Sequence, residues 1–236
     1  MRAYRMFALT LFLLSAGAEA GERKLFTDVP DFTQTAVRGA GNGHGQQFCA
    51  PAAVSNSLMW LSRSALDQKQ LVIRLASADY MNTSLKNGTG TSGVLRGVDR
   101  YITESVGGYR RLAYQGWRKH PQRFASGVRV PTLEFMTAGV AKGAAAWLNV
   151  GWYRVDATAG EYRRVGGHWV TLVGYDLGAN QLILNDPAPR AGKTRSHEYV
   201  TFRALGGGTL VGKKSGLPTA ARGYLQLGRG MHVHPK

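Results

Sequence analysis

The stretch QQFCAPAAVSNSLMWL (46–61) contains the only cysteine of the chain, Cys49, and places it where a helix is predicted to begin. Apolar residues recur at helical spacing from Val54 to Leu61. Pro51 suits the first turn of a helix, where its missing N–H has no partner to lose. The pattern therefore predicts a helix over 51–66, with Cys49 at or beside its N-terminus.

Further helices are predicted around this stretch. GAGNGHG (39–45), just before Cys49, reads as a loop, because so many glycines carry a high entropy cost in any regular element. A helix over 67–81 with Asp67 as N-cap, a third helix over 93–106 and a short one over 132–143 are expected.

The second half of the chain changes from helical to strand-like patterning. Segments 144–155, 168–176 and 181–187 are rich in aromatic and β-branched residues and are separated by turn residues, which predicts an antiparallel meander. Weaker strand patterns cover 109–117, 197–205 and 223–228. Helices followed by strands indicate an α+β fold, not an alternating βαβ fold.

The hairpin GGHWVTLVGYDLGANQLILNDP (166–187) brings two functional side chains to one end of the predicted sheet. His168 is expected to open the first strand, and Asp186 follows the second. Both lie at the open end of the hairpin, so their side chains are expected to meet. A general base with an orienting carboxylate needs this arrangement.

Cys49 completes a candidate nucleophile site. The helix dipole and a neighbouring imidazolium both favour a thiolate, and the backbone N–H of the cysteine can stabilise an oxyanion. Three alternatives remain open at this point: a buried structural cysteine, His44 as the base, and zinc bound by Cys49, His168 and Asp186. No Cys-x-x-Cys or His-Glu-x-x-His motif supports zinc, and no cofactor is expected.

Four segments in this order resemble the papain-like cysteine peptidases. VPDFTQ (29–34), FCAPAAVSNSLMWL (48–61), GHWVTLVGYD (167–176) and LILNDP (182–187) are most similar to the peptidase domain of bacteriocin-processing transporters, which cleaves after double-glycine leaders, and to its exported relatives. The resemblance covers about residues 27–190. It implies a papain-like fold and an exported hydrolase that cleaves peptide or isopeptide bonds through a thioester.

The resemblance also implies roles for individual residues. Cys49 would be the nucleophile and His168 the base, and Asp186 would orient the imidazole. Asn185 is the alternative for the last role, since papain-type enzymes use an asparagine there.

The oxyanion-hole glutamine of the family is harder to place. Gly43 stands six residues before Cys49, where that glutamine commonly lies. If 39–45 is part of an inserted loop, Gln34 takes the role, and Gln47 is the second choice.

The formal charge of +16 indicates an attraction to anionic surfaces. It supports an alternative function, a non-catalytic papain-like module that binds an anionic cell-envelope polymer through its basic face. The densest basic stretch, 109–124, lies in no finger, helix-turn-helix or RNA-recognition pattern, so nucleic acid is not an expected partner.

The N-terminus has the pattern of an export signal. A basic start, a short apolar run and AEA (18–20) predict cleavage after Ala20 and a secreted or periplasmic protein. A peptidase-like domain is expected over 21–205, and no later segment has the pattern of a membrane span. Residues 206–236 are expected to form a Gly-rich strand or tail, with His232 and His234 on a mobile end.

Overall fold

The structure, a computed structural model, defines most of the chain after the predicted export signal. After residue 20, side chains are described up to residue 151 except at 38–44, 63–66, 117 and 129–130, and again over 166–179 and 181–188. The predicted signal over 1–20 and the alternative base His44 lie outside the described residues. The described backbone covers 21–37, 45–62, 67–116, 118–128, 131–156, 161–179, 181–188 and short strands from 198 onward.

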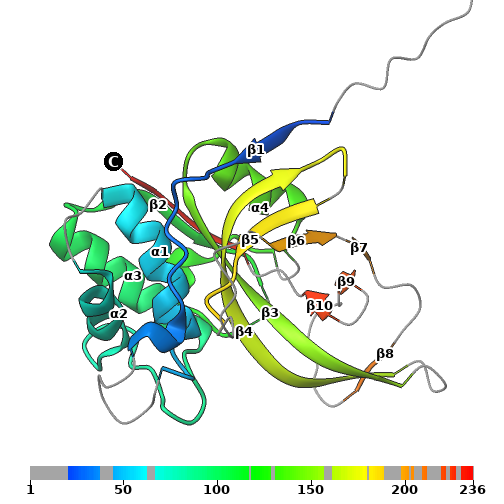
Figure 1. Ribbon diagram of the computed structural model, residues 1–236, viewed down its shortest axis with the longest axis horizontal. Coiled ribbons are helices and arrows are strands. Elements are labelled where there is room, and N and C mark those ends of the chain that lie inside the picture. Colours follow the sequence, from blue (N-terminus) through cyan, green and yellow to red (C-terminus); the bar gives the residue numbers. More distant parts are fainter. Residues whose placement is uncertain are drawn as a thin grey trace, which may run out of the picture.

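Three helices lie together on one side of the molecule (Figure 1). They are α1 (Cys49–Ser62), α2 (Gln68–Ala76) and α3 (Thr91–Ser105). All three were expected, but α2 ends five residues before the predicted limit of 81, because Ser77 takes an extended conformation with ψ 164°. Asp67 caps α2 as predicted and accepts a hydrogen bond from the Lys69 N–H at 2.9 Å. In the described part of the chain, no helix is long and apolar enough to cross a bilayer.

Helix α1 is the central helix of the fold. Every residue from Ala50 to Leu58 is buried, small polar residues included. The small side chains of Ala50, Ala52 and Ala53 let neighbouring elements approach the helix on several sides, as expected of a helix that is enclosed and not amphipathic. The Ala-rich sequence after Cys49 therefore places the nucleophile candidate at the start of a deeply buried helix.

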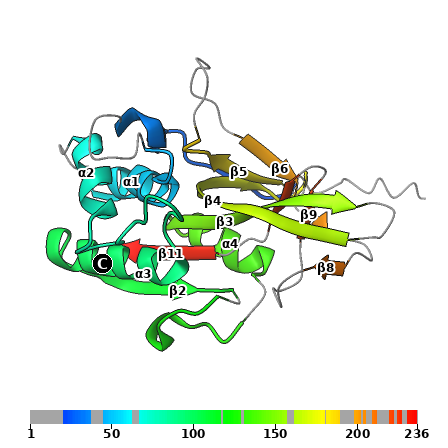
Figure 2. The same cartoon turned by 90° about the horizontal axis from the view of Figure 1, so that it is seen from below.

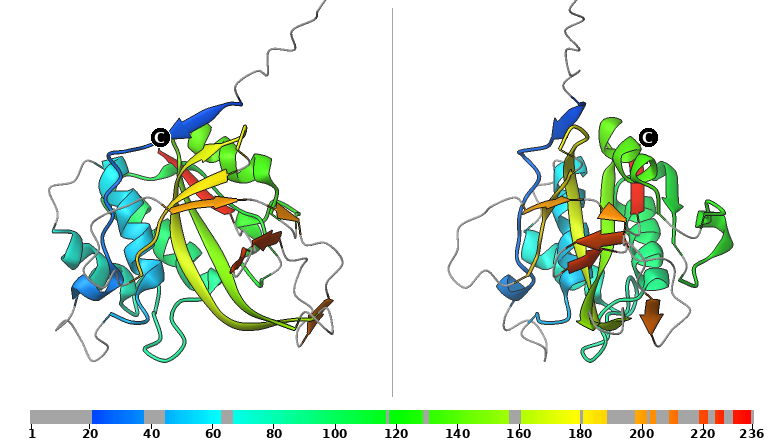
Figure 3. Two further views of the ribbon diagram at one scale, coloured as in Figure 1. Left: turned by 45° about the vertical axis from the view of Figure 1, so that its right-hand side comes forward. Right: turned by 90° about the vertical axis from the view of Figure 1, so that its right-hand side faces the viewer.

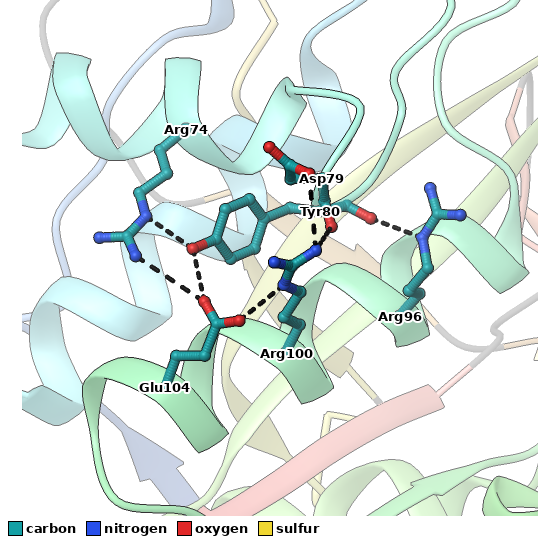
Figure 4. A network of polar contacts seen from close by, with 6 residues as sticks. All are labelled: Arg74, Asp79, Tyr80, Arg96, Arg100 and Glu104. Carbon is teal, nitrogen blue, oxygen red and sulfur yellow. Dashed lines mark hydrogen bonds and ion pairs between the residues drawn. The ribbon is translucent and has the colours of Figure 1, made fainter.

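A polar network joins α2, the turn after it and α3 (Figure 4). The Tyr80 hydroxyl accepts from Arg74 Nε and donates to Glu104 Oε2, both at 2.8 Å. Arg100 Nε donates to Glu104 Oε1 at 2.6 Å, and these hydrogen bonds from Arg100 and then Tyr80 lower the pKa of Glu104. The network fixes the helices relative to one another.

The sheet is antiparallel through its centre and is built on one long hairpin that extends beyond the helices (Figure 3). Its main strands follow the order β6-β5-β4-β3. A helix, α4 (Leu133–Ala141), precedes the hairpin in sequence. The strands are β2 (Tyr109–Tyr114), β3 (Ala145–Asp156), β4 (Glu161–Asp176), β5 (Gln181–Asn185) and β6 (Glu198–Thr201).

Both faces of the sheet are buried. Trp147 of β3 and Trp169 of β4 pack in a cluster with α1 and α3. Their neighbours Leu148 and Val170 pack on the other face, in a cluster with residues of α4. Because successive side chains point to opposite faces of a strand, this double burial explains the nearly continuous apolar run of AAAWLNV (144–150).

Strand β4 begins seven residues earlier than the sequence predicts. The expectation that His168 opens the strand is wrong: it lies within β4, opposite Val150 of β3. Residues 161–164 continue the ladder by pairing with 153–156, with a register shift between Trp152 and Tyr153. The glycine pair before His168 is therefore part of the hairpin and not its end.

The last residues also differ from their prediction. His232 and His234 lie in a strand, β11 (Gly230–Pro235), that is inserted between β2 and β3 (Figure 2). The expectation of a mobile tail is therefore wrong. The backbone N–H and C=O groups at the facing edges of β2 and β3 need hydrogen-bond partners, and β11 supplies them.

Short elements complete the described chain. Residues 23–25 pair with 174–176 of β4, which ties the first described residues to the sheet. Every described strand after residue 206 pairs into the same sheet. The short elements are β1 (Arg23–Leu25), η1 (Gln34–Val37), η2 (Gln122–Phe124), β7 (Arg203–Ala204), β8 (Thr209–Val211), β9 (Thr219–Ala221) and β10 (Tyr224–Gln226).

Candidate active site

Cys49 is the first residue of α1, as the sequence predicts. The chain reaches it through a tight turn in which the Phe48 N–H donates to the Gly45 carbonyl at 3.0 Å. The Phe48 carbonyl then accepts from the Ala52 N–H at 2.9 Å, so the helix begins at the cysteine. The side chain is partly exposed, and no second cysteine exists to pair with it.

His168 and Asp186 meet as the sequence predicts. His168 Nε2 lies 2.5 Å from Asp186 Oδ1, and the two side chains are 10% and 13% exposed. The same carboxylate oxygen accepts from the Ala188 N–H at 2.8 Å, which fixes the carboxylate just after β5. Since Nε2 is engaged by Asp186, Nδ1 is the nitrogen available to the thiol.

The surroundings of His168 favour its charged form. Burial on its own lowers the pKa of the imidazole. Hydrogen bonds to Asp186 and Cys49, together with Coulombic attraction to both, outweigh burial and raise the pKa of His168 to about 10. The hydrogen bond to Cys49 brings the thiol, the imidazole and the carboxylate into one connected chain.

This pKa predicts a pH-dependent contribution to stability. The pKa of His168 rises from 6.5 to about 10 on folding, so the stabilisation is complete below pH 6.5 and is lost as the pH rises through about 10. The unfolding free energies of the wild type and of His168→Gln should therefore differ more near pH 6 than near pH 10. A difference that grows with pH in urea titrations would contradict the assigned direction.

Buried hydrogen bonds fix β4 relative to α1 and to β3. Thr171, three residues after His168, donates through Oγ1 to the Ala53 carbonyl at 2.7 Å, four residues after Cys49. Asn149 of β3 donates through Nδ2 to the His168 carbonyl at 3.2 Å. The cysteine and the histidine are therefore positioned by rigid elements and not by loops.

Asn185, the alternative orienting residue, is tied to the N-terminal segment. It is fully buried, and its Nδ2 donates to the carbonyls of Val29 and Pro30 at 3.3 and 3.2 Å. The asparagine thus anchors the N-terminal segment that leads to Gln34. Asp186, one of the two residues considered for orienting His168, makes the contact with its imidazole.

The two candidate glutamines occupy different places. Gln34 is 5% exposed, and its Nε2 donates to the Gln46 carbonyl at 2.5 Å, three residues before Cys49. Its backbone N–H donates to the Pro187 carbonyl at 2.8 Å, next to Asp186. Gln47 is partly exposed and lines a cavity together with Cys49.

That cavity has a volume of about 280 Å³, near the lower end for ligand pockets in proteins. Cys49 and Gln47 line one part of it. Asn149 of β3 and Trp169 of β4, which lie opposite each other in the hairpin, line another part. The rest comes from segment 87–91, which includes the start of α3, from Arg118 and from Gly167 of β4.

Gly45 is the tightest point of the turn that leads to Cys49. Its φ is +74°, and a Cβ there would lie 2.0 Å from the Gln34 carbonyl oxygen. We expect Gly45→Ala to lower the unfolding free energy by at least about 2 kcal/mol, because backbone strain and a backbone clash add. Gly107→Ala is the matched control: φ is +83°, but nothing lies within 4 Å of its Cβ. Equal losses in urea denaturation would show that the clash is absent.

The zinc alternative has no support in the described side chains. Among them, no group of three or more His, Cys, Asp and Glu residues could hold a metal ion.

The fold agrees with the comparisons to known proteins. A sequence profile of the Peptidase_C39 like family matches residues 26–206. The chain belongs to this family. Its relation to the papain-like cysteine peptidases and its α+β fold, both expected from the sequence, are thereby confirmed.

A solved structure supports the fold of this C39-like chain independently. A crystal structure described as that of a C39-like peptidase from Bacillus anthracis superposes with a TM-score of 0.51 at 11% identity, covering 91% of this chain and 98% of the other. At that identity the likeness concerns the fold alone. No curated protein matches the chain.

Several residues of the site were not identified from the sequence. Thr171 and Asn149 lie in strands that read only as core, and nothing in their spacing marks a hydrogen bond to α1 or to His168. Arg118 and segment 87–91 are far from Cys49 in sequence, and only the packing of α3 against the sheet brings them to the cavity.

Proposed function

We propose that this C39-like protein is a cysteine peptidase that cleaves peptide or isopeptide bonds, with Cys49 as the nucleophile, His168 as the general base and acid, and Asp186 as the orienting group. The observation that carries the proposal is the connected chain from Cys49 to Asp186, in which His168 hydrogen-bonds both partners. A triad of this kind supplies an activated nucleophile and a base held in one orientation.

The chemistry follows from this chain. The Cys49 sulfur, as thiolate, attacks the carbonyl carbon of the scissile bond and forms a tetrahedral oxyanion. The C–N bond then breaks while the His168 imidazolium gives its proton to the leaving amine, which leaves a thioester. Water next attacks the thioester as His168 takes its proton, and breaking of the C–S bond releases the acid and restores the thiol.

The oxyanion needs donors that are already in place. We assign the backbone N–H of Cys49 and the side-chain amide of Gln34, with Gln47 as the second choice. Gln34 is supported by its burial and by its fixed contact to the Gln46 carbonyl, because a preorganised donor loses nothing at the moment of reaction. Comparison of kcat in Gln34→Ala and Gln47→Ala separates the two glutamines, since loss of one oxyanion donor costs roughly 10²-fold or more.

The proposal is tested with a diverse peptide library, with new termini detected by mass spectrometry. The wild type should generate new amino termini, and an acid quench should trap acyl fragments on Cys49. Cys49→Ser should give neither product at a comparable rate. Cleavage by the wild type without any adduct on Cys49 would argue against the thioester route.

We also propose that the protein is exported. The pattern of residues 1–20 supports this, with cleavage after Ala20. Expression in a bacterial host should give a secreted or periplasmic product. Its measured mass should equal that of a chain that begins at Gly21. An intracellular product that retains residues 1–20 would contradict the proposal.

A further inference from the structure

One wall of the cavity beside Cys49 is the N-terminus of α3. The helix has Gly90 as N-cap, with no side-chain hydrogen bond to the cap and no acidic residue in its first turn. The N–H groups of a first helical turn have no partners within the helix and carry partial positive charge. Gly90 and Thr91 both line the cavity, so this end of the helix faces the space that Cys49 shares.

Thr91 adds a polar group in the same wall. The residue is 5% exposed, and its hydroxyl has no hydrogen-bond partner among the described residues. A buried hydroxyl without a hydrogen-bond partner is unfavourable. An acceptor from a bound molecule would satisfy it.

Arg118 brings a full positive charge to the cavity. Two contacts fix the backbone that carries it. Ser92 Oγ, in the first turn of α3, donates to the Lys119 carbonyl at 3.0 Å, and the His120 ring nitrogen Nδ1 lies 2.7 Å from the Arg118 carbonyl. The segment that carries Arg118 and the helix N-terminus therefore both belong to the wall of this cavity.

The wall leaves room for a ligand. A Cβ on Gly90 would meet no atom within 4 Å. The φ of Gly90 is −78°, which suits any residue, so the backbone does not require glycine here. Among the described residues, no Asp or Glu lines the cavity.

We infer that this wall, formed by Gly90, Thr91 and Arg118, binds a carboxylate of the peptide substrate next to the scissile bond. The inference rests on the proposed peptidase function and adds a substrate class to it. The carboxylate accepts hydrogen bonds from the Arg118 guanidinium, the Thr91 hydroxyl and the first N–H groups of α3, and so supplies the cap that the helix lacks. Two sources share this chemistry: an Asp or Glu side chain and the C-terminal carboxylate of a peptide.

The first test does not depend on turnover. Iodoacetate carries a carboxylate and iodoacetamide does not, and Cys49 is the only thiol of the chain. The ratio of their alkylation rates measures attraction of a carboxylate to the cavity. We expect Arg118→Gln to lower this ratio roughly tenfold, as suits the loss of one charge-assisted hydrogen bond. Lys119→Gln removes the neighbouring exposed charge and should change the ratio less than about twofold.

A second pair of variants separates this role from a structural one. Gly90→Asp and Gly90→Asn both give α3 a good N-cap and should keep or raise stability. Only Gly90→Asp places a negative charge in the wall, so it should lower the iodoacetate preference well below that of Gly90→Asn. Ratios that do not respond to Arg118→Gln and Gly90→Asp would overturn the inference.

Matched peptides then identify the source of the carboxylate. Higher kcat/KM for Glu than for Gln beside the scissile bond indicates a side chain, and higher kcat/KM for a free C-terminus than for its amide indicates a terminus. Either preference should fall in Arg118→Gln. Cleavage that ignores both pairs contradicts the inference and leaves the peptidase function standing. An Arg118-dependent iodoacetate preference without cleavage of any peptide supports the carboxylate site and removes the peptidase function.

Discussion

Replacement of Cys49 by alanine is expected to abolish peptide turnover, with a loss in kcat of at least about 10⁴-fold. The chain has no other thiol, so no second residue can form the thioester. The measurement is kcat on the best peptide found in the library, with the variant prepared free of wild-type enzyme.

Folding is not expected to confound this result. The Cys49 side chain is only partly buried, and the backbone around it is held by the turn from Gly45 and by the helical hydrogen bonds of α1. The urea midpoint of Cys49→Ala should therefore stay close to that of the wild type. Turnover that persists in a folded Cys49→Ala protein would rule out Cys49 as the nucleophile.

Replacement of Asp186 should produce the second largest effect. We expect Asp186→Ala to lower kcat/KM by about 10²–10⁴-fold, because His168 loses both its orienting contact at 2.5 Å and the charge that stabilises the imidazolium. Asp186→Asn keeps a hydrogen-bonding group beside Nε2 and should lose less activity. In both variants the pKa of His168 should fall from about 10, since the Asp186 carboxylate helps to raise it.

The control for this series is Asp79→Asn. Asp79 lies far along the chain from the triad, its side chain is 76% exposed, and it pairs with Arg100 in the network between the helices. The same loss of one negative charge there should leave kcat/KM unchanged. An Asp186→Ala variant that keeps wild-type kcat/KM and an unchanged pKa of His168 would show that Asp186 does not orient His168.

Strong local signals made the central part of the site predictable. Pro51 after Cys49 and the apolar spacing beyond it allowed the helix start to be placed at the cysteine. The turn between the strands carrying His168 and Asp186 is short, so register alone brought both residues to one end of the hairpin. The helix and hairpin patterns had already singled out Cys49, His168 and Asp186, and the family resemblance then gave each of them a role.

Long-range packing explains what the sequence could not provide. Asn185 and Asp186 are adjacent in sequence, and only the folded structure shows that Asp186 contacts His168 while Asn185 donates to the carbonyls of the N-terminal segment. Strand β4 continues before His168 because β3 offers it a partner, a fact that turn-like residues around 156–161 conceal. Likewise, β11 reads as a short glycine-flanked tail until the edges of β2 and β3 are known.

We expect Cys49 and His168 to react as a thiolate–imidazolium pair. The most direct test is the rate of iodoacetamide alkylation of Cys49 against pH, in the wild type and in His168→Ala. We predict that at acidic pH the wild type is alkylated much faster than His168→Ala, because only the wild type keeps an imidazolium beside the sulfur. Slow alkylation that follows an ordinary thiol in both proteins would contradict the pair and the function built on it.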